Sequence, residues 1–123
     1  MLVVVCLTGC AFNPVTATDC VTQVGPHQTV TLHATIVSHT WKRMTHVGVL
    51  VMAAGINGTG GSLIEYEFHD RIDPFETRRN VVGEEYAAVV GHNSVGAHLG
   101  AISSCWARFV DYADGSGWST SPL

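Results

Sequence analysis

The sequence predicts an all-β fold, an antiparallel β-sandwich of about six or seven short strands in a single domain. Three observations support this class. Apolar and polar residues alternate with a period of two in several segments, turn residues separate those segments, and no segment shows a convincing helical period. Of the 123 residues, 46% are hydrophobic and 13% are charged, against a typical charged share of about 25%, so a packed core is expected.

Five segments carry the strand signal. The clearest early one is 28–37, where Val30, Leu32, Ala34 and Ile36 alternate with Thr and His. Segment 46–53 is apolar on both faces, as a central strand is. Segment 62–69 again alternates between apolar and polar residues. The expected strands are 28–37, 46–53, 62–69, 86–90 and 104–112.

Loop chemistry supports the same arrangement. Segment 55–61 is rich in Gly and contains Asn57-Gly58, which supplies positions with positive φ, so a hairpin loop is expected there. Asp73-Pro74 marks another turn inside the charged segment 70–80. A helix over 84–90 is an alternative, since Ala and Glu favour it while the valines and Gly91 do not.

The chain begins with an apolar run that ends in Leu7-Thr8-Gly9-Cys10. This pattern resembles the lipobox of bacterial lipoproteins, in which a Leu, two small residues and a Cys close the signal peptide. The resemblance implies that the Cys10 thiol receives a diacylglycerol and becomes the new N-terminus. The alternative is an ordinary first strand over 2–7. The run is shorter than the roughly 18 apolar residues of a membrane-spanning helix, so an anchored protein is expected rather than a spanning one.

The lipoprotein interpretation sets the expected domains and address. Residues 1–9 form the signal peptide, 10–19 a small, polar tether, and 20–123 the β-sandwich domain. The expected location is the outer membrane or periplasm, with the lipid anchor holding the protein to the membrane. In that family, a residue other than Asp after the Cys accompanies sorting to the outer membrane, and Ala11 is compatible with that.

The four cysteines can be interpreted on the same basis. If Cys6 leaves with the signal peptide and Cys10 is acylated, Cys20 and Cys105 remain. Two cysteines in an oxidising compartment usually pair, so a Cys20–Cys105 disulfide is predicted. The alternative is two separate buried thiols in a cytosolic protein.

The end of the chain, C-W-A-R-F-V-D-Y-A-D-G-S-G-W, resembles the closing strand and turn of a group of small bacterial exported proteins of uncharacterised function. That resemblance implies an immunoglobulin-like sandwich and carries no known activity. The matching residues are Cys105, Tyr112, Asp114, Gly115 and Trp118. A structural role is expected for the last three: Gly115 for the turn, Asp114 for an Asx hydrogen bond and Trp118 as a lid on the core.

No enzymatic signature is found in the sequence, and no catalytic residue or cofactor is predicted. There is no G-x-S-x-G elbow and no phosphate-binding G-x-x-x-x-G-K-[ST]. Two acidic pairs occur, Glu65/Glu67 and Glu84/Glu85. The first pair shares one strand face at a spacing that could serve glycoside chemistry, but a solvated strand face is the preferred interpretation. The net charge is −4, and the sequence has no basic patch that would bind phosphate. Both observations argue against nucleic acid as a partner.

Seven histidines are an unusual number for a chain of 123 residues. Neutral imidazole is the commonest metal ligand, and adjacent strands could bring His33, His46 and His69 together. These three are the candidate metal ligands, although exposed histidines on polar strand faces are the default interpretation. The predicted function is therefore a non-enzymatic exported envelope module, structural or protein-binding, with an unknown envelope protein as partner. The alternative is a periplasmic metal-binding protein that uses strand histidines.

Overall fold

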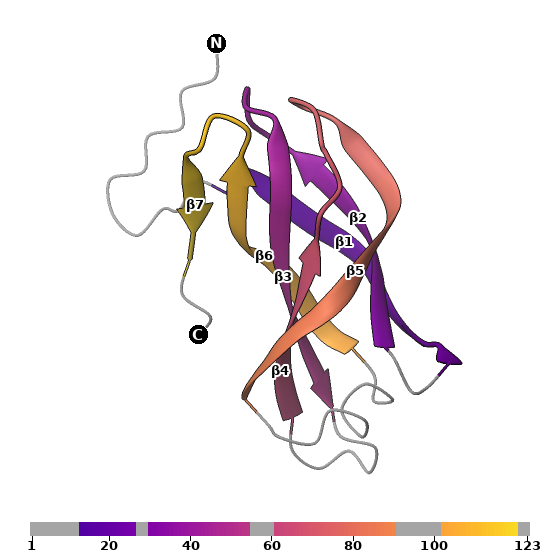
Figure 1. Ribbon diagram of the computed structural model, residues 1–123. Helices are drawn as coiled ribbons and strands as arrows, with labels where there is room; N and C mark the ends of the chain where they lie inside the picture. Colours follow the sequence, from indigo (N-terminus) through magenta and orange to yellow (C-terminus); the bar gives the residue numbers. More distant parts are fainter. Residues whose placement is uncertain (1–12, 27–29, 55–60, 91–101, 121–123) are drawn as a thin grey trace.

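A computed structural model describes residues 13–26, 30–54, 61–90 and 102–120. These residues form seven antiparallel strands in one hydrogen-bonded sheet, which confirms the all-β antiparallel prediction (Figure 1). The strands are β1 (Val15–Val24), β2 (Val30–Ser38), β3 (Met44–Ala54), β4 (Gly61–Phe68), β5 (Thr77–Val90), β6 (Ile102–Tyr112) and β7 (Gly117–Ser119).

The sheet curls into a half-barrel, and its strand order is β1-β2-β5-β4-β3-β6-β7. A cut between β4 and β3 would leave the two strand sets of a constant-type immunoglobulin sandwich, β1-β2-β5-β4 and β3-β6-β7. However, β3 and β4 pair without interruption from Val47↔Phe68 to Ala54↔Gly61, so the two sets stay in one sheet. The predicted two-sheet, immunoglobulin-like sandwich is therefore not confirmed.

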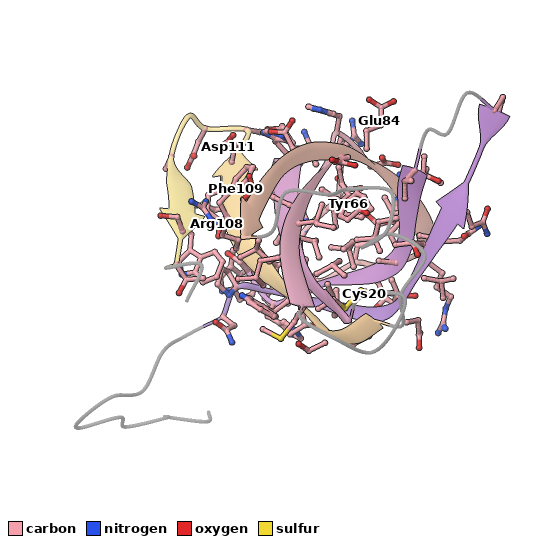
Figure 2. The ribbon with its side chains drawn as sticks, turned by 90° about the horizontal axis from the view of Figure 1, so that it is seen from below. Cys20, Tyr66, Glu84, Arg108, Phe109 and Asp111 are labelled. Carbon is pink, nitrogen blue, oxygen red and sulfur yellow. A yellow bond between two sulfur atoms is a disulfide. The ribbon has the colours of Figure 1, made fainter. Side chains whose placement is uncertain are left out.

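The core lies on the inner face of the curl. Strand alternation places one residue in two on that face, and the largest fully buried side chains include Tyr66, Phe68, Leu32 and Ile36. Seen end-on in Figure 2, the sheet curves around these side chains, with Tyr66 inside and Glu84 outside. Burial raises the pKa of the Tyr66 phenol well above its usual range, and nearby Glu85 adds to the effect, so the hydroxyl stays protonated.

β1 was not among the expected strands, and β5 begins at Thr77 instead of at residue 86. The folded region begins at Val15, inside the segment 10–19 expected to be a tether, because Val15 and Ala17 alternate with Thr16 and Thr18 and are buried. The alternative of a helix over 84–90 is wrong: β5 continues to Val90, since β4 pairs along this part of it. Pairing with neighbouring strands here outweighs the helix propensity of Ala and Glu.

Two bulges with left-handed residues lie in the pairings of β2 with its two neighbours, β1 and β5. The β1–β2 register shifts between Thr18 and Val21, and Asp19 has a φ of 55° there. The β2–β5 register shifts next to Asn80, whose φ is 56°. Asp and Asn tolerate this left-handed conformation better than other non-glycine residues, and an extra residue bends the strand.

The Cys20–Cys105 disulfide is confirmed. It joins β1 to β6 across the open side of the half-barrel, with 6.6 Å between the two Cα atoms. Cys105 Sγ also lies 3.8 Å from the carbonyl oxygen of Ala17, so the two strands run close together at this point. The bulge at Asp19 immediately precedes Cys20 and orients it toward β6.

Several predicted features lie outside the described residues: the signal peptide 1–9, the lipidation residue Cys10 and the loop residues 55–60. The hairpin that contains this loop is formed, since β3 and β4 pair on both sides of it. Within the described ranges, no helix has the length and apolar character needed to cross a bilayer.

Candidate functional site

The β3–β4 hairpin brings two of the three predicted histidines together. In the register of β3 with β4, Val47 pairs with Phe68, so the next position along the hairpin places His46 opposite His69. The two rings stack with 4.5 Å between centroids and 10° between planes. His33 lies elsewhere, on β2, where its Nδ1 is 3.1 Å from Asn80 Oδ1. The predicted set His33, His46 and His69 is therefore not assembled as a group.

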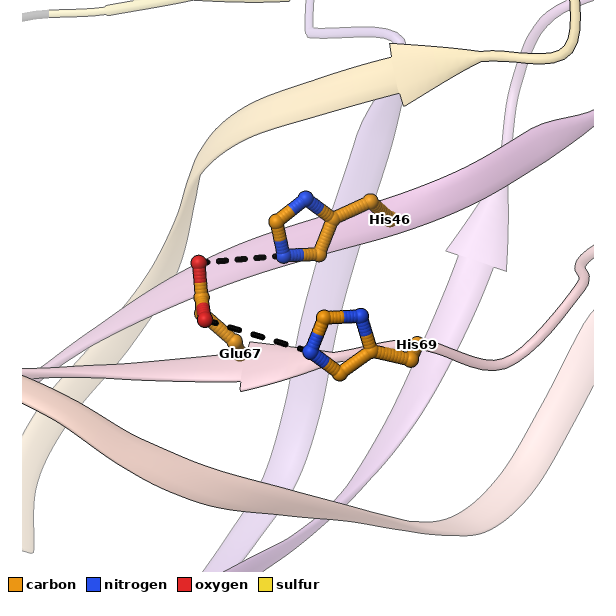
Figure 3. Close-up of side chains that lie close together, drawn as sticks. All are labelled: His46, Glu67 and His69. Atoms are coloured by element: carbon orange, nitrogen blue, oxygen red, sulfur yellow. Dashed lines mark ion pairs between the residues drawn. The ribbon is translucent and has the colours of Figure 1, made fainter.

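Glu67 takes the third place in the cluster. It lies near the end of β4, two residues before His69, which directly follows the strand, so both side chains lie on the same side of the chain. Figure 3 shows its carboxylate facing both imidazoles. One oxygen is 3.1 Å from His46 Nε2, and the other is 3.9 Å from His69 Nε2. Nitrogen and oxygen ligand atoms of these three residues lie within 4.8 Å of one another. We call His46, Glu67 and His69 the His–Glu cluster.

Asp111 orients the imidazole of His46. It lies opposite His46 in the β3–β6 register, and its Oδ2 is 3.0 Å from His46 Nδ1. With the Nδ1 proton donated to Asp111, the Nε2 atom faces Glu67. Although only 3.1 Å separates Nε2 from the Glu67 carboxylate, their alignment is not that of a hydrogen bond, and His46 Nε2 is buried without a hydrogen-bond partner.

An aromatic ring forms one wall of the cluster. Phe109 projects from β6, near Arg108 and Asp111 in Figure 2, and its ring meets that of His46 edge-on at 4.9 Å. Gly48 permits this position, because a Cβ atom there would overlap the Phe109 ring. The ring therefore shields His46, whose side chain is 22% exposed, while that of His69 remains 69% exposed.

Glu65 lies further along the same face of β4 and is buried rather than solvated. Only 5% of the residue is exposed, so the preferred interpretation of the Glu65/Glu67 pair as a solvated strand face is wrong for Glu65. The β3–β6 register shifts between Gly48 and Val49, and Arg108 lies in that irregular part of β6. Its Nε lies 3.2 Å from Glu65 Oε1, without the alignment of a hydrogen bond, and this ion pair places a counter-charge beside the buried carboxylate.

A second surface feature is an exposed aromatic pair. Trp41, in the β2–β3 connection, is 84% exposed, and Phe75, in the β4–β5 connection, is 52% exposed. Their rings meet edge-on with 4.7 Å between centroids. Phe75 also has a φ of 59°, an uncommon conformation for an aromatic residue. The two connections thus hold large apolar side chains in water.

The turn predicted near the C-terminus is present. Gly115 has a φ of 88°, its N–H donates to the Tyr112 carbonyl, and the Ser116 N–H donates to Asp114 Oδ1 at 2.9 Å. Hydrogen bonds from Ser116, together with Lys42, lower the pKa of the Asp114 carboxyl to about 2. Trp118 follows on β7 opposite Val110 and packs, partly buried, against the core.

A groove of about 460 Å³ follows the open side of the half-barrel. Residues of β1, including Val15 and Ala17, line one side, and Trp106 and Ala107 of β6 line the other. Thr120, whose N–H donates to the Arg108 carbonyl at 2.8 Å, stands at its edge. The groove therefore lies between β1 and β6, the two strands that the disulfide joins.

No family model, no curated protein and no solved structure matches this chain.

The sequence predicted two residues of the His–Glu cluster as metal ligands, His46 and His69, but neither Glu67 as the third ligand nor Asp111 as the partner of His46. The signal for Glu67 was present, since Glu67 and His69 are two residues apart on a strand. The signal for His46 was the hairpin register: once Ala54 pairs with Gly61, His46 falls opposite His69. Asp111 depended on the shifted β3–β6 register, which the sequence does not reveal.

Proposed function

We propose that this chain is a non-enzymatic exported module of the cell envelope, anchored by a lipid on Cys10, that acts by binding another envelope protein. The observation that carries the proposal is the Cys20–Cys105 disulfide, which closes a separation of 85 residues. Structural disulfides persist in oxidising compartments and are rare in reducing ones. A lipoprotein signal peptide would also direct export of the protein to an oxidising compartment.

The aromatic pair Trp41–Phe75 is the proposed contact surface. Tryptophan is enriched among the residues that dominate binding energy at protein interfaces. Trp41 leaves 84% of its surface in water, although large apolar side chains are stabilised by burial. A partner that covers this pair would remove that cost. The aromatic pair lies on the β2–β3 and β4–β5 connections of the disulfide-closed sheet.

Lipidation tests the proposed address. Radiolabelled palmitate should enter the wild-type protein in a bacterial host and should not enter the Cys10→Ser variant, because the thioether forms on the Cys10 thiol. The matched control is Cys6→Ser, which should be labelled like the wild type, since Cys6 leaves with the signal peptide. Equal labelling of the Cys10→Ser variant would contradict the proposal.

Site-specific crosslinking tests the contact surface. A photoreactive amino acid in place of Trp41 should give a defined covalent adduct with one envelope protein in intact cells. The same probe at Val82, an exposed position on β5, should not give this adduct. Identical adducts from both positions would show that the aromatic pair has no special role.

A second candidate function is a periplasmic metal-binding protein that uses strand histidines. The observation that favours it is the His–Glu cluster, where two imidazoles and a carboxylate converge. Both functions are compatible in one exported protein, since the cluster and the aromatic pair comprise different residues.

The immunoglobulin-like relationship is likewise a proposal. The strand order supports it, because an immunoglobulin sandwich has the same order once β3 and β4 are separated.

A further inference from the structure

We propose that His46, Glu67 and His69 form an open, three-ligand site for a zinc ion, with Asp111 as the positioning residue for His46. The inference rests on the second candidate function and is independent of the lipid anchor. It assigns the ligands, the carboxylate that orients His46 and the class of metal.

His46 and Glu67 bring their ligand atoms close together. Asp111 Oδ2 lies 3.0 Å from His46 Nδ1, which leaves Nε2 on the side of Glu67 Oε1, 3.1 Å away. Nε2 is buried and has no aligned hydrogen-bond partner. A cation bound by Nε2 and Oε1 together would give both atoms a partner.

The partners around His46 are those of a metal-ligating histidine. Metal-ligating histidines almost always donate their other ring N–H to a carboxylate or carbonyl, which fixes the tautomer and the ring orientation. Asp111 provides this carboxylate at 3.0 Å. The edge of the Phe109 ring holds the other side of the imidazole, so His46 is positioned before any ion arrives.

The distances between the ligand atoms can be compared with those in a zinc site. In a tetrahedral zinc site with bonds of roughly 2.0–2.1 Å, ligand atoms are about 3.3 Å apart. The separation of 3.1 Å between His46 Nε2 and Glu67 Oε1 is close to this value. With one ligand atom from each of the three residues, the atoms lie within 4.8 Å of one another, so His69 has to move closer to complete the site. The exposed His69 ring makes that movement when it rotates out of its stack on His46.

The ligand types determine the class of metal. Two imidazoles and one carboxylate suit zinc and other first-row transition ions, whereas calcium and magnesium take oxygen ligands. Three protein ligands leave a fourth position. This position faces solvent on the side of His69 and would hold water or a donor from a partner.

Calorimetry with zinc chloride on the full, oxidised chain tests the site. We expect one zinc ion to bind with a micromolar dissociation constant and this binding to weaken at least tenfold in His69→Ala and in Glu67→Gln. Asp111→Asn should weaken binding by about 10- to 100-fold, the usual effect of losing the carboxylate that holds a ligating histidine. The matched control is His33→Ala, which removes a strand histidine outside the cluster and should bind zinc like the wild type.

Cobalt(II) provides a readout that a general loss of stability would not imitate. In the wild type, its visible absorption should be that of a tetrahedral site with nitrogen and oxygen ligands, and the spectrum should change in Asp111→Asn. If zinc binds equally to the wild type and to the cluster variants, the ligand assignment is wrong while the metal-binding function stands. If the wild type binds no zinc, both are wrong.

Discussion

Replacement of Cys105 by alanine should lower the free energy of unfolding by about 2–5 kcal/mol and the melting temperature by roughly 10–20 °C. The chain-entropy model assigns about 4.5 kcal/mol to a closed loop of this size, because the link restricts the unfolded chain. The bond is also the only covalent link between β1 and β6 among the described residues, and it spans the open side of the half-barrel. Thermal and urea unfolding of the oxidised protein measure both quantities.

Cys20→Ala should have an effect similar to that of Cys105→Ala, and the double variant should be no less stable than either single one. Ser104→Ala is the matched control, since Ser104 is an exposed neighbour on β6 and its loss should change stability by less than about 0.5 kcal/mol. Additive losses in the double variant would show that the two cysteines contribute through separate packing instead of a shared bond.

Arg108→Met should destabilise the protein by about 2–4 kcal/mol, because the buried Glu65 carboxylate would lose its counter-charge. The expected cost is below that of a fully buried pair, since the Arg108 side chain is 31% exposed. Urea unfolding at neutral pH measures this loss.

Two further variants separate the buried charge from other effects of the substitution. Glu65→Leu combined with Arg108→Met should recover most of the lost stability, because replacement of both partners by apolar residues removes the uncompensated charge. Arg71→Met breaks an exposed ion pair with Asp73 and should cost at most about 1 kcal/mol. A double variant less stable than Arg108→Met would contradict the role assigned to this pair.

The strands with clear alternation could be predicted from the sequence, and the way in which they assemble could not. Segments 28–37 and 62–69 correspond closely to β2 and β4, because their apolar residues face a core on one side. The choice between one curled sheet and two packed sheets depends on the unbroken pairing of β3 with β4. Alternation is the same in both arrangements and does not distinguish them.

The candidate site shows the same limit at the level of residues. His46 and His69 could be proposed from residue type, but their neighbours depend on register. Glu65 looked solvated because it alternates with Ile64 and Tyr66, yet Arg108 from β6 lies beside it. Local sequence determines which face of a strand a residue occupies, while irregularities in the neighbouring strand determine whether that face is covered.

Intact-mass spectrometry of the protein isolated from bacterial membranes, with and without thiol alkylation, tests the central claim most directly: an exported, disulfide-closed, lipid-anchored module. The account predicts a chain that begins at Cys10, carries a diacylglycerol and takes up alkylating reagent at Cys20 and Cys105 only after reduction. A soluble chain that retains residues 1–9 and is alkylated at both cysteines without reduction would contradict it.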